Sequence, residues 1–305
     1  MIKRIRENAL QFLVLVLAGT IQPAAAQSVP APSYSPLKVW SAEGGSLGSA
    51  IKGFYASTGT TYSGAVRGPF GGGATAFASQ IAGNVWFGGN LVEKLGLRQG
   101  SDIWVRVYQF FPETFCFSYG GLGDGWGATK WMRAQTSSGR STLELGSASP
   151  NYDGTYAFKR TPACGTVTAA YGDINEMGAG NRPFPNYTAA PIVRGKWQAL
   201  QVHWHFGDSD GYMRAWIDDV YLGQSNHTTL RSGAVVEGIV YGDYWNGGFP
   251  VAQGFHYDEI VITTERPNTV DSGGRPFIHP NHRVADFSGS GAPSRPAPPQ
   301  GLSVQ

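Results

Sequence analysis

Short stretches in which apolar and polar residues alternate are the feature that most constrains how this chain folds. In residues 103–111, IWVRVYQFF, every second residue from Ile103 to Val107 is apolar. The segments 197–206 (WQALQVHWHF) and 213–218 (MRAWID) alternate in the same way. A period of two places alternate side chains on opposite faces of a β-strand. Each segment is therefore predicted to be a strand with one buried face, which needs a partner sheet to cover it.

Many more short strands are expected, joined by turns, and helical periodicity is almost absent. With 43 Gly and 19 Pro, the chain has residues for a turn after each short segment. The best helical segments, Ala74–Ala82 and Leu91–Leu95, are both brief. Further strand candidates are residues 129–135, 141–146, 235–241 and 255–263. The pattern predicts an all-β fold, an antiparallel sandwich of two sheets.

The two ends of the chain are expected to lie outside this sandwich. Residues 1–26 have a basic start, an apolar run and an Ala-Ala-Ala cleavage site, which is the pattern of a secretory signal peptide. A flexible Pro/Ser-rich leader follows at 27–36, and a flexible Gly/Ser/Pro-rich tail occupies 286–305. Residues 37–285 are predicted to form a single β-sandwich domain, in a secreted or periplasmic protein with no membrane span after cleavage.

The charge balance excludes a general attraction to polyanions. Residues 1–26 hold three basic residues and one acidic residue, so the remainder carries 20 Lys and Arg against 20 Asp and Glu. A neutral chain has no overall field that would gather nucleic acid. Nucleic acid is therefore not an expected partner, and any charged ligand must be held by a local group.

The two cysteines, Cys116 and Cys164, both follow the signal peptide, and an oxidising compartment would let them pair. One disulfide is expected, with two separate buried thiols as the alternative. Two cysteines do not make a zinc site, and no metal or cofactor is predicted. The segment Asp208–Gly211 (DSDG) offers oxygens for a structural calcium ion, but it reads more simply as a hairpin turn.

The polar faces of the predicted strands carry an unusual mixture of aromatic, Arg, His and Gln side chains. Sugar rings stack on aromatic faces, and hydroxyl and carboxylate groups accept hydrogen bonds from planar donors. This mixture favours a polysaccharide or oligosaccharide as partner, although an ordinary solvent-facing sheet surface is the alternative. The residues are Trp104, Arg106, Tyr108, Arg133, Gln135, Gln201, His203, His205, Arg214 and Trp216.

Two longer segments bear a resemblance to known proteins. Residues 195–223, GKWQALQVHWHFGDSDGYMRAWIDDVYLG, with 255–265, FHYDEIVITTE, look like the closing strands of concanavalin A-like jelly rolls. Residues 100–115, GSDIWVRVYQFFPETF, with KWMR at 130–133, resemble strands of heparin-lyase-like and related polysaccharide lyase domains. The resemblance covers about residues 37–266. It implies a jelly-roll sandwich and, for activity, β-elimination on a uronate-containing glycan.

Such a reaction needs a group that neutralises the uronate carboxylate, so that the proton on the neighbouring carbon becomes acidic. Arg106, Arg133 or Arg214 would supply this group. Gln135 or Gln201 would assist through a hydrogen bond. The lyase resemblance leaves the choice among these residues open.

The reaction also needs a base and an acid. His203 or His205 is the candidate base, because imidazole titrates near neutral pH, and Tyr108 or Tyr241 is the candidate acid. A structural pair of imidazoles is the alternative interpretation of the two histidines. His256 is expected on the core side of its strand with Ile260 and Ile262, as a buried histidine with its hydrogen bonds satisfied.

Two other functions remain open from the sequence. One is a noncatalytic glycan-binding module of the same fold. The other is a structural or adhesive envelope protein whose sandwich only presents loops. A groove filled by the chain's own loops would favour this last interpretation.

Overall fold

A computed structural model describes residues 29–80, 90–115, 129–146, 169–174, 179–184, 186, 190–245 and 252–287. The expected signal peptide, Cys116 and Cys164 lie outside these residues, and so does nearly all of the expected C-terminal tail. The pairing of the two cysteines therefore stays a prediction.

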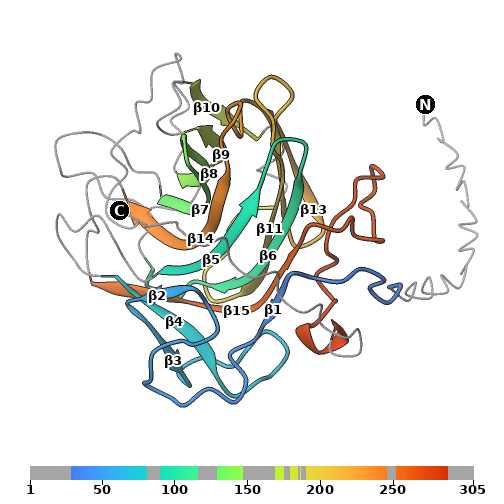
Figure 1. Ribbon diagram of the computed structural model, residues 1–305. Coiled ribbons are helices and arrows are strands. Elements are labelled where there is room, and N and C mark those ends of the chain that lie inside the picture. The colour runs from blue at the N-terminus through green and yellow to red at the C-terminus, as the bar shows by residue number, and fades with distance from the viewer. Residues whose placement is uncertain are drawn as a thin grey trace, which may run out of the picture.

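The described strands form two antiparallel sheets packed face to face (Figure 1). Sheet A has the order β13-β12-β11-β6-β15-β4-β3, and β1 also pairs with β15. Its strands are β1 (Lys38–Trp40), β3 (Thr60–Ser63), β4 (Thr75–Gln80), β6 (Asp102–Phe110), β11 (Trp197–His205), β12 (Tyr212–Ile217), β13 (Val220–Asn226) and β15 (Gln253–Thr263).

Sheet B has the order β10-β9-β8-β7-β14-β5-β2. Its strands are β2 (Ala56–Thr58), β5 (Asn90–Leu97), β7 (Thr129–Thr136), β8 (Gly139–Gly146), β9 (Ala169–Ile174), β10 (Ala179–Pro183) and β14 (Val236–Trp245). The one helical element among the described residues is the short 3-10 helix η2 (Val284–Phe287). The two-sheet jelly-roll sandwich predicted from the sequence is confirmed.

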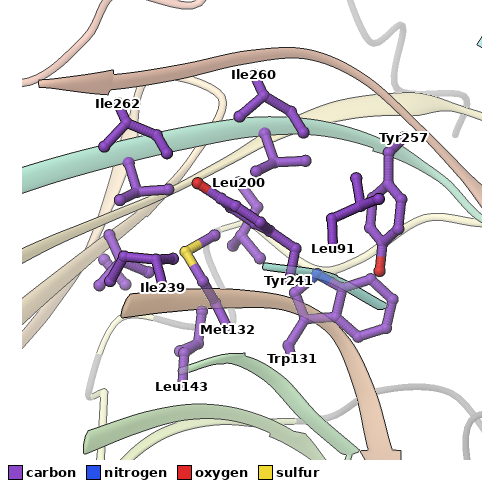
Figure 2. Packing of buried hydrophobic residues seen from close by; sticks show 14 of the residues in the cluster. Leu91, Trp131, Met132, Leu143, Leu200, Ile239, Tyr241, Tyr257, Ile260 and Ile262 are labelled. Carbon is purple, nitrogen blue, oxygen red and sulfur yellow. The ribbon is translucent and has the colours of Figure 1, made fainter. Parts of the chain in front are cut away.

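The core lies between the sheets and is built from the apolar face of each alternating strand. In Figure 2, Leu200 and Ile262 of sheet A face Met132 and Ile239 of sheet B, with the ring of Tyr241 between them. All of the residues predicted for the buried faces of β6, β11 and β12 belong to this core. Because burial of large apolar side chains dominates folding, the alternation alone was enough to predict which faces meet.

Two predictions about local structure were wrong. The segments Ala74–Ala82 and Leu91–Leu95, expected as the best helical stretches, contain the strands β4 and β5 instead. Ala76 and Ala78 are fully buried on the inner face of β4. Pairing with neighbouring strands on both sides outweighs the weak helix preference of an Ala-rich segment.

His256 also lies on the other side of its strand from the one predicted. Phe255 and Tyr257 face the core, but a β-bulge between Asp258 and Val261 inserts an extra residue, so the alternation changes parity before Ile260. Within the bulge, Glu259 has a left-handed φ of 52°. His256 therefore points to the outer face, although it is still buried and its Nδ1 lies 2.8 Å from the Thr75 hydroxyl.

The two ends of the described chain pack across the outer face of sheet A. Residues 264–287, which we call the C-terminal strap, follow β15 and end in η2 (red in Figure 1). Residues 29–36, expected as part of a flexible leader, lie against this strap. Pro30 offers its carbonyl oxygen to His282 Nε2 at 2.8 Å, and Tyr34 packs on Phe287. These residues extend the sandwich, because both aromatic rings are buried there.

Burial of His256 predicts a specific loss of stability in acid. Burial lowers the pKa of His256 from 6.5 to about 4. Between these values the unfolded chain takes up a proton that the folded chain does not, so stability is present above about pH 6.5 and falls as the pH drops towards 4. Relative to a His256→Gln variant, the wild-type free energy of unfolding should fall by up to about 1.4 kcal/mol per pH unit in this range. Urea denaturation at several pH values measures this, and parallel curves for the two proteins would contradict it.

Candidate functional site

The strands β6, β11 and β12 bring most of the predicted site residues together on the outer face of sheet A. Their antiparallel registers align them in rows across the sheet. One row holds Asp102, His205 and Tyr212, the next holds Trp104, His203 and Arg214, and a third holds Arg106, Gln201 and Trp216. Tyr108 lies one row further along β6, opposite Ala199. The registers therefore place eight of the predicted residues on one face, together with Asp102 and Tyr212.

This face is not an open groove, however, because the C-terminal strap covers much of it. Arg106 is fully buried and donates hydrogen bonds to the carbonyl oxygens of His279 (2.9 Å), His282 and Glu259 (3.3 Å). Its pKa is lowered by burial, although the nearby acidic groups oppose that shift. Every hydrogen bond described for this guanidinium goes to a backbone carbonyl of the same chain, so Arg106 has a structural role here.

Four other predicted residues are also bonded to the strap. Trp104 Nε1 donates to Pro276 O at 3.1 Å, and the Tyr108 hydroxyl donates to Pro280 O at 2.5 Å. Trp216 Nε1 donates to Asp271 at 2.9 Å, and Gln201 accepts the backbone N–H of Ile278 at 3.0 Å. An alternating pattern shows which residues share a face, but it does not show whether a distant part of the chain covers that face. The prediction that these residues line an exposed binding surface is corrected accordingly.

The remaining predicted residues lie elsewhere. Arg133 and Gln135 are in β7, where the alternate residues Met132 and Ala134 face the core. Arg133 and Gln135 therefore belong to the outer face of sheet B, on the opposite side of the sandwich from the histidines. Tyr241 is in the core itself, where burial, with a smaller contribution from the charge of Glu93, raises its pKa well above 10. These three residues do not share a site with His203 and His205.

Two rows of sheet A stay clear of most of the strap, and they contain a cluster of polar and aromatic side chains. We call Asp102, His203, His205, Tyr212 and Arg214 the Asp–His cluster. Asp102 Oδ1 lies 2.7 Å from His203 Nε2 and 3.2 Å from His205 Nδ1, so one carboxylate contacts both imidazoles. Burial alone would raise the pKa of Asp102, but the hydrogen bonds and charges of the two histidines outweigh it and lower the pKa. Asp102 is therefore ionised at neutral pH.

The two histidines have different surroundings. His203 is only 2% exposed and stacks on Trp104, with the ring centroids 4.1 Å apart and the planes at 11°. Burial lowers the pKa of His203, although its hydrogen bond to Asp102 opposes the shift. His205 has 22% of its side chain exposed. His203 is thus a buried neighbour of the carboxylate, while His205 is the imidazole that can meet a ligand.

His205 is also the better placed of the two for proton transfer. Because Asp102 is an ionised acceptor, Nδ1 of His205 carries the hydrogen, which leaves the lone pair of the neutral ring on Nε2. Nε2 lies 3.8 Å from Asp210 Oδ2. The Tyr212 ring stacks on His205 at 5.1 Å, and the Arg214 guanidinium lies 4.5 Å from the centroid of that ring. A base, a phenol and a cation therefore lie side by side.

Neighbouring amide side chains hold Arg214 in place. Its Nε donates to Gln224 Oε1 at 2.6 Å, and Gln224 Nε2 donates in turn to Asn226 Oδ1. Burial raises the pKa of Tyr212, with the charge of Arg214 opposing the shift, so its hydroxyl keeps a proton at neutral pH. The sequence predictions missed Asp102 and Tyr212. Both could have been found, because each continues the same-face alternation of a strand by one further step.

The described residues do not bring together three or more His, Cys, Asp or Glu side chains in an arrangement that would hold a metal ion. Within the same residues, no helix has the length and apolar character needed to cross a membrane.

Two antiparallel sheets packed face to face define this chain as a jelly-roll sandwich. No protein-family model matches the chain, and no curated protein matches its sequence. Among solved structures, an endo-β-1,4-glucuronan lyase from the fungus Trichoderma reesei aligns with 76% of this chain and 96% of its own, at 13% identity and a TM-score of 0.47.

Two further structures give similar values. The alginate lyase vAL-1 from Chlorella virus has 11% identity and a TM-score of 0.46, over 72% of this chain and 100% of its own. The cellulose-induced protein Cip1 has 14% identity and a TM-score of 0.43, over 74% of this chain and 92% of its own. Identities this low carry no residue roles across to this chain, so the roles below come from its own side chains.

The buried arginine makes a testable prediction about stability. Replacing Arg106 by Met keeps much of the side-chain length but leaves three backbone carbonyl oxygens without their donor. The expected loss is about 3 kcal/mol or more of unfolding free energy. Arg214→Met, at a half-exposed position, should lose less than about 1 kcal/mol. Chemical denaturation of the two variants measures this, and equal losses would show that the strap does not depend on Arg106.

Proposed function

We propose that this chain is an exported protein that cleaves a uronate-containing glycan by β-elimination at the Asp–His cluster. The observation that carries the proposal is the position of His205. Its imidazole is oriented by an ionised carboxylate, is partly open to solvent, and lies beside a protonated tyrosine and an arginine. These are the base, the acid and the neutralising group that such an elimination requires.

In the proposed reaction, the Arg214 guanidinium binds the uronate carboxylate and makes the proton on C5 more acidic. His205 Nε2 removes this proton, and Asp102 stabilises the imidazolium that forms. The electrons of the C5–H bond form a C4–C5 double bond as the C4–O bond breaks. The Tyr212 hydroxyl protonates the leaving oxygen, and it then regains a proton that His205 releases through solvent. No cofactor is needed for this proton balance.

Tyr212 takes the role for which Tyr108 and Tyr241 were the sequence candidates. Tyr108 is hydrogen-bonded to the strap and Tyr241 lies in the core, whereas Tyr212 contacts His205 directly. Export rests on the basic start, apolar run and cleavage site within residues 1–26. The product, an oligosaccharide with an unsaturated uronate at one end, would form outside the cytoplasm.

A noncatalytic glycan-binding module is the second candidate. The observation that favours it is the strap, which is hydrogen-bonded to Trp104 and Gln201 and so covers strand residues beside the cluster. Tyr212, Arg214 and Gln224 would then hold a sugar without cleaving it. A covered face is also what a structural envelope protein would show, and the accessible His205 is the reason why we prefer a glycan function.

The elimination can be followed directly, because the unsaturated uronate absorbs ultraviolet light. The chain without residues 1–26 should raise the absorbance of at least one substrate among alginate, glucuronan, heparin-type glycans and pectate. His205→Gln should lower the initial rate by about a hundredfold or more, since it removes the base. Tyr212→Phe should lower the rate as well. Gln135→Ala, on the outer face of sheet B, is the matched control and should stay within about twofold of the wild type.

Two results would overturn this assignment. If His205→Gln cleaves at the wild-type rate while a variant of sheet B does not, the site lies on the other sheet. If no substrate is cleaved, the protein is not a lyase of these glycans.

Binding to acidic glycans gives an independent prediction for Arg214. If its guanidinium holds the uronate carboxylate, Arg214→Ala should weaken binding of acidic oligosaccharides by about tenfold, which is about 1.4 kcal/mol. Binding of neutral oligosaccharides should change much less. Calorimetric titration of both kinds of ligand measures this, and equal losses for both would show that Arg214 does not bind the carboxylate.

A further inference from the structure

A hollow on the outer face of sheet A has no role in the proposed reaction. It has a volume of about 520 Å³ and lies between the start of β13 and the part of the strap around residues 270–277. Its lining includes Asp219, Tyr221, Asp271, Arg275, Phe277 and His279. We call it the strap pocket. Its lining combines two aromatic rings with several charged and polar groups.

The walls of the strap pocket are held in a fixed arrangement. Asp271 is buried and accepts hydrogen bonds from Trp216 Nε1 (2.9 Å) and Arg275 Nε (2.8 Å), and from the backbone N–H groups of Gly273 and Arg275. Arg275 in turn lies over the Tyr221 ring, 3.6 Å from its centroid. One carboxylate therefore ties the tip of the strap to both β12 and β13. Such a preformed pocket loses little entropy when it binds a ligand.

The charges of the strap pocket disfavour an acidic ligand. Arg275, the one permanent cation among the described residues that line it, is paired with Asp271. Hydrogen bonds from Trp216 and Arg275 lower the pKa of Asp271 against the effect of burial, so this carboxylate stays ionised. Burial lowers the pKa of His279, which keeps this imidazole neutral at pH 7. Asp219 has no ion-pair partner among the described residues and leaves the pocket with a net negative charge. A uronate carboxylate would therefore be held less well here than at Arg214, because the cation that lines the pocket is already paired.

The same groups suit a neutral sugar ring. The Asp219 carboxylate accepts hydrogen bonds, and the free guanidinium N–H groups of Arg275 donate them. His279 donates from Nε2, because its Nδ1 already accepts the backbone N–H of Asn281. The partly exposed Tyr221 offers apolar surface against which the C–H face of a pyranose can pack, whereas Phe277 is only 2% exposed and supports the pocket from within. The hydroxyl groups of a neutral sugar form hydrogen bonds with such donors and acceptors, and a site that binds them needs no net charge.

The strap pocket and the Asp–His cluster lie along the same pair of strands. Tyr221 at the pocket pairs with Trp216 of β12, and Tyr212 of the cluster lies four residues earlier in that strand. At about 3.3 Å per residue, this separation is about 13 Å. The charges of Arg214 in the cluster and Arg275 in the pocket both oppose the rise in pKa that burial causes at Tyr221, so both charges reach the same side chain. One oligosaccharide of a few units can therefore reach both.

We propose that the strap pocket binds a neutral sugar unit, and that the glycan held by this chain carries neutral sugars beside its uronates. This inference builds on the proposed function, since it places the uronate at Arg214. A site for a neutral sugar is expected in a protein that binds a mixed glycan, and not in one that binds a polymer made of uronates alone.

Ligand-observed NMR tests the pocket separately from catalysis. The probes are methyl β-glucopyranoside, methyl β-galactopyranoside and methyl β-glucuronopyranoside, each added to the chain without residues 1–26. In an Arg214→Ala background, which removes the proposed uronate site, at least one neutral glycoside should bind more tightly than the glucuronide. Asp219→Ala should weaken this neutral binding by about tenfold. Asp219→Asn should narrow the preference for neutral over acidic probes, because it removes the charge and keeps the side-chain size.

The matched control is Glu237→Ala, which removes one negative charge from β14 of sheet B and should leave binding within about twofold of the wild type. Absence of neutral binding in the wild type, or neutral binding that survives Asp219→Ala, would overturn the pocket assignment. Cleavage is read in the same preparation from the ultraviolet assay. Binding without cleavage would reject the lyase and keep the pocket, whereas cleavage without binding would reject the pocket and keep the lyase.

Discussion

The contact between the Arg106 guanidinium and three backbone carbonyl groups is the interaction on which the outer face of sheet A depends. A buried cation needs hydrogen-bond acceptors on every side, because water is excluded from it. The strap supplies two of them at His279 and His282, and the bulge in β15 supplies the third at Glu259. The side chain of Glu259 accepts the N–H of Val284, which fixes the start of η2. One arginine in the middle of a sheet thus positions the end of the described chain.

The course of the strap decides what the rest of the face can do. Where the strap crosses the rows of Arg106 and Trp216, it converts polar strand residues into buried structural anchors. Where it turns back around residues 270–277, it encloses the strap pocket against β13. The rows of Asp102 and Trp104 lie at its border, and there the buried His203 supports the carboxylate that orients the partly exposed His205. The course of the strap therefore determines which side chains are accessible at both candidate sites.

The sequence was sufficient to predict the fold, because alternation reports directly which face of each strand is buried. It also placed His203, His205 and Arg214 on one face correctly. It failed where the answer depended on contacts between distant segments. No local pattern in β7 shows that Arg133 belongs to the other sheet, and nothing near Arg106 shows that residues 279–282 will cover it. Tyr241 has the same strand parity as the apolar Ile239, and this parity places it in the core despite its hydroxyl group. His256 was misplaced because a bulge reverses parity without any clear sequence signal.

The position of the strap at the end of the described chain also affects when the protein can finish folding. A ribosome releases a chain from its N-terminus, so β6 with Arg106 appears long before the strap. Until residues 279–282 emerge, the guanidinium keeps its water and this part of the outer face stays uncovered. The outer face of sheet A is therefore complete only once residues 264–287 have been made. A chain that stops early would expose Trp104 and Trp216. Exposed aromatic surface of this kind promotes aggregation and recognition by chaperones and proteases.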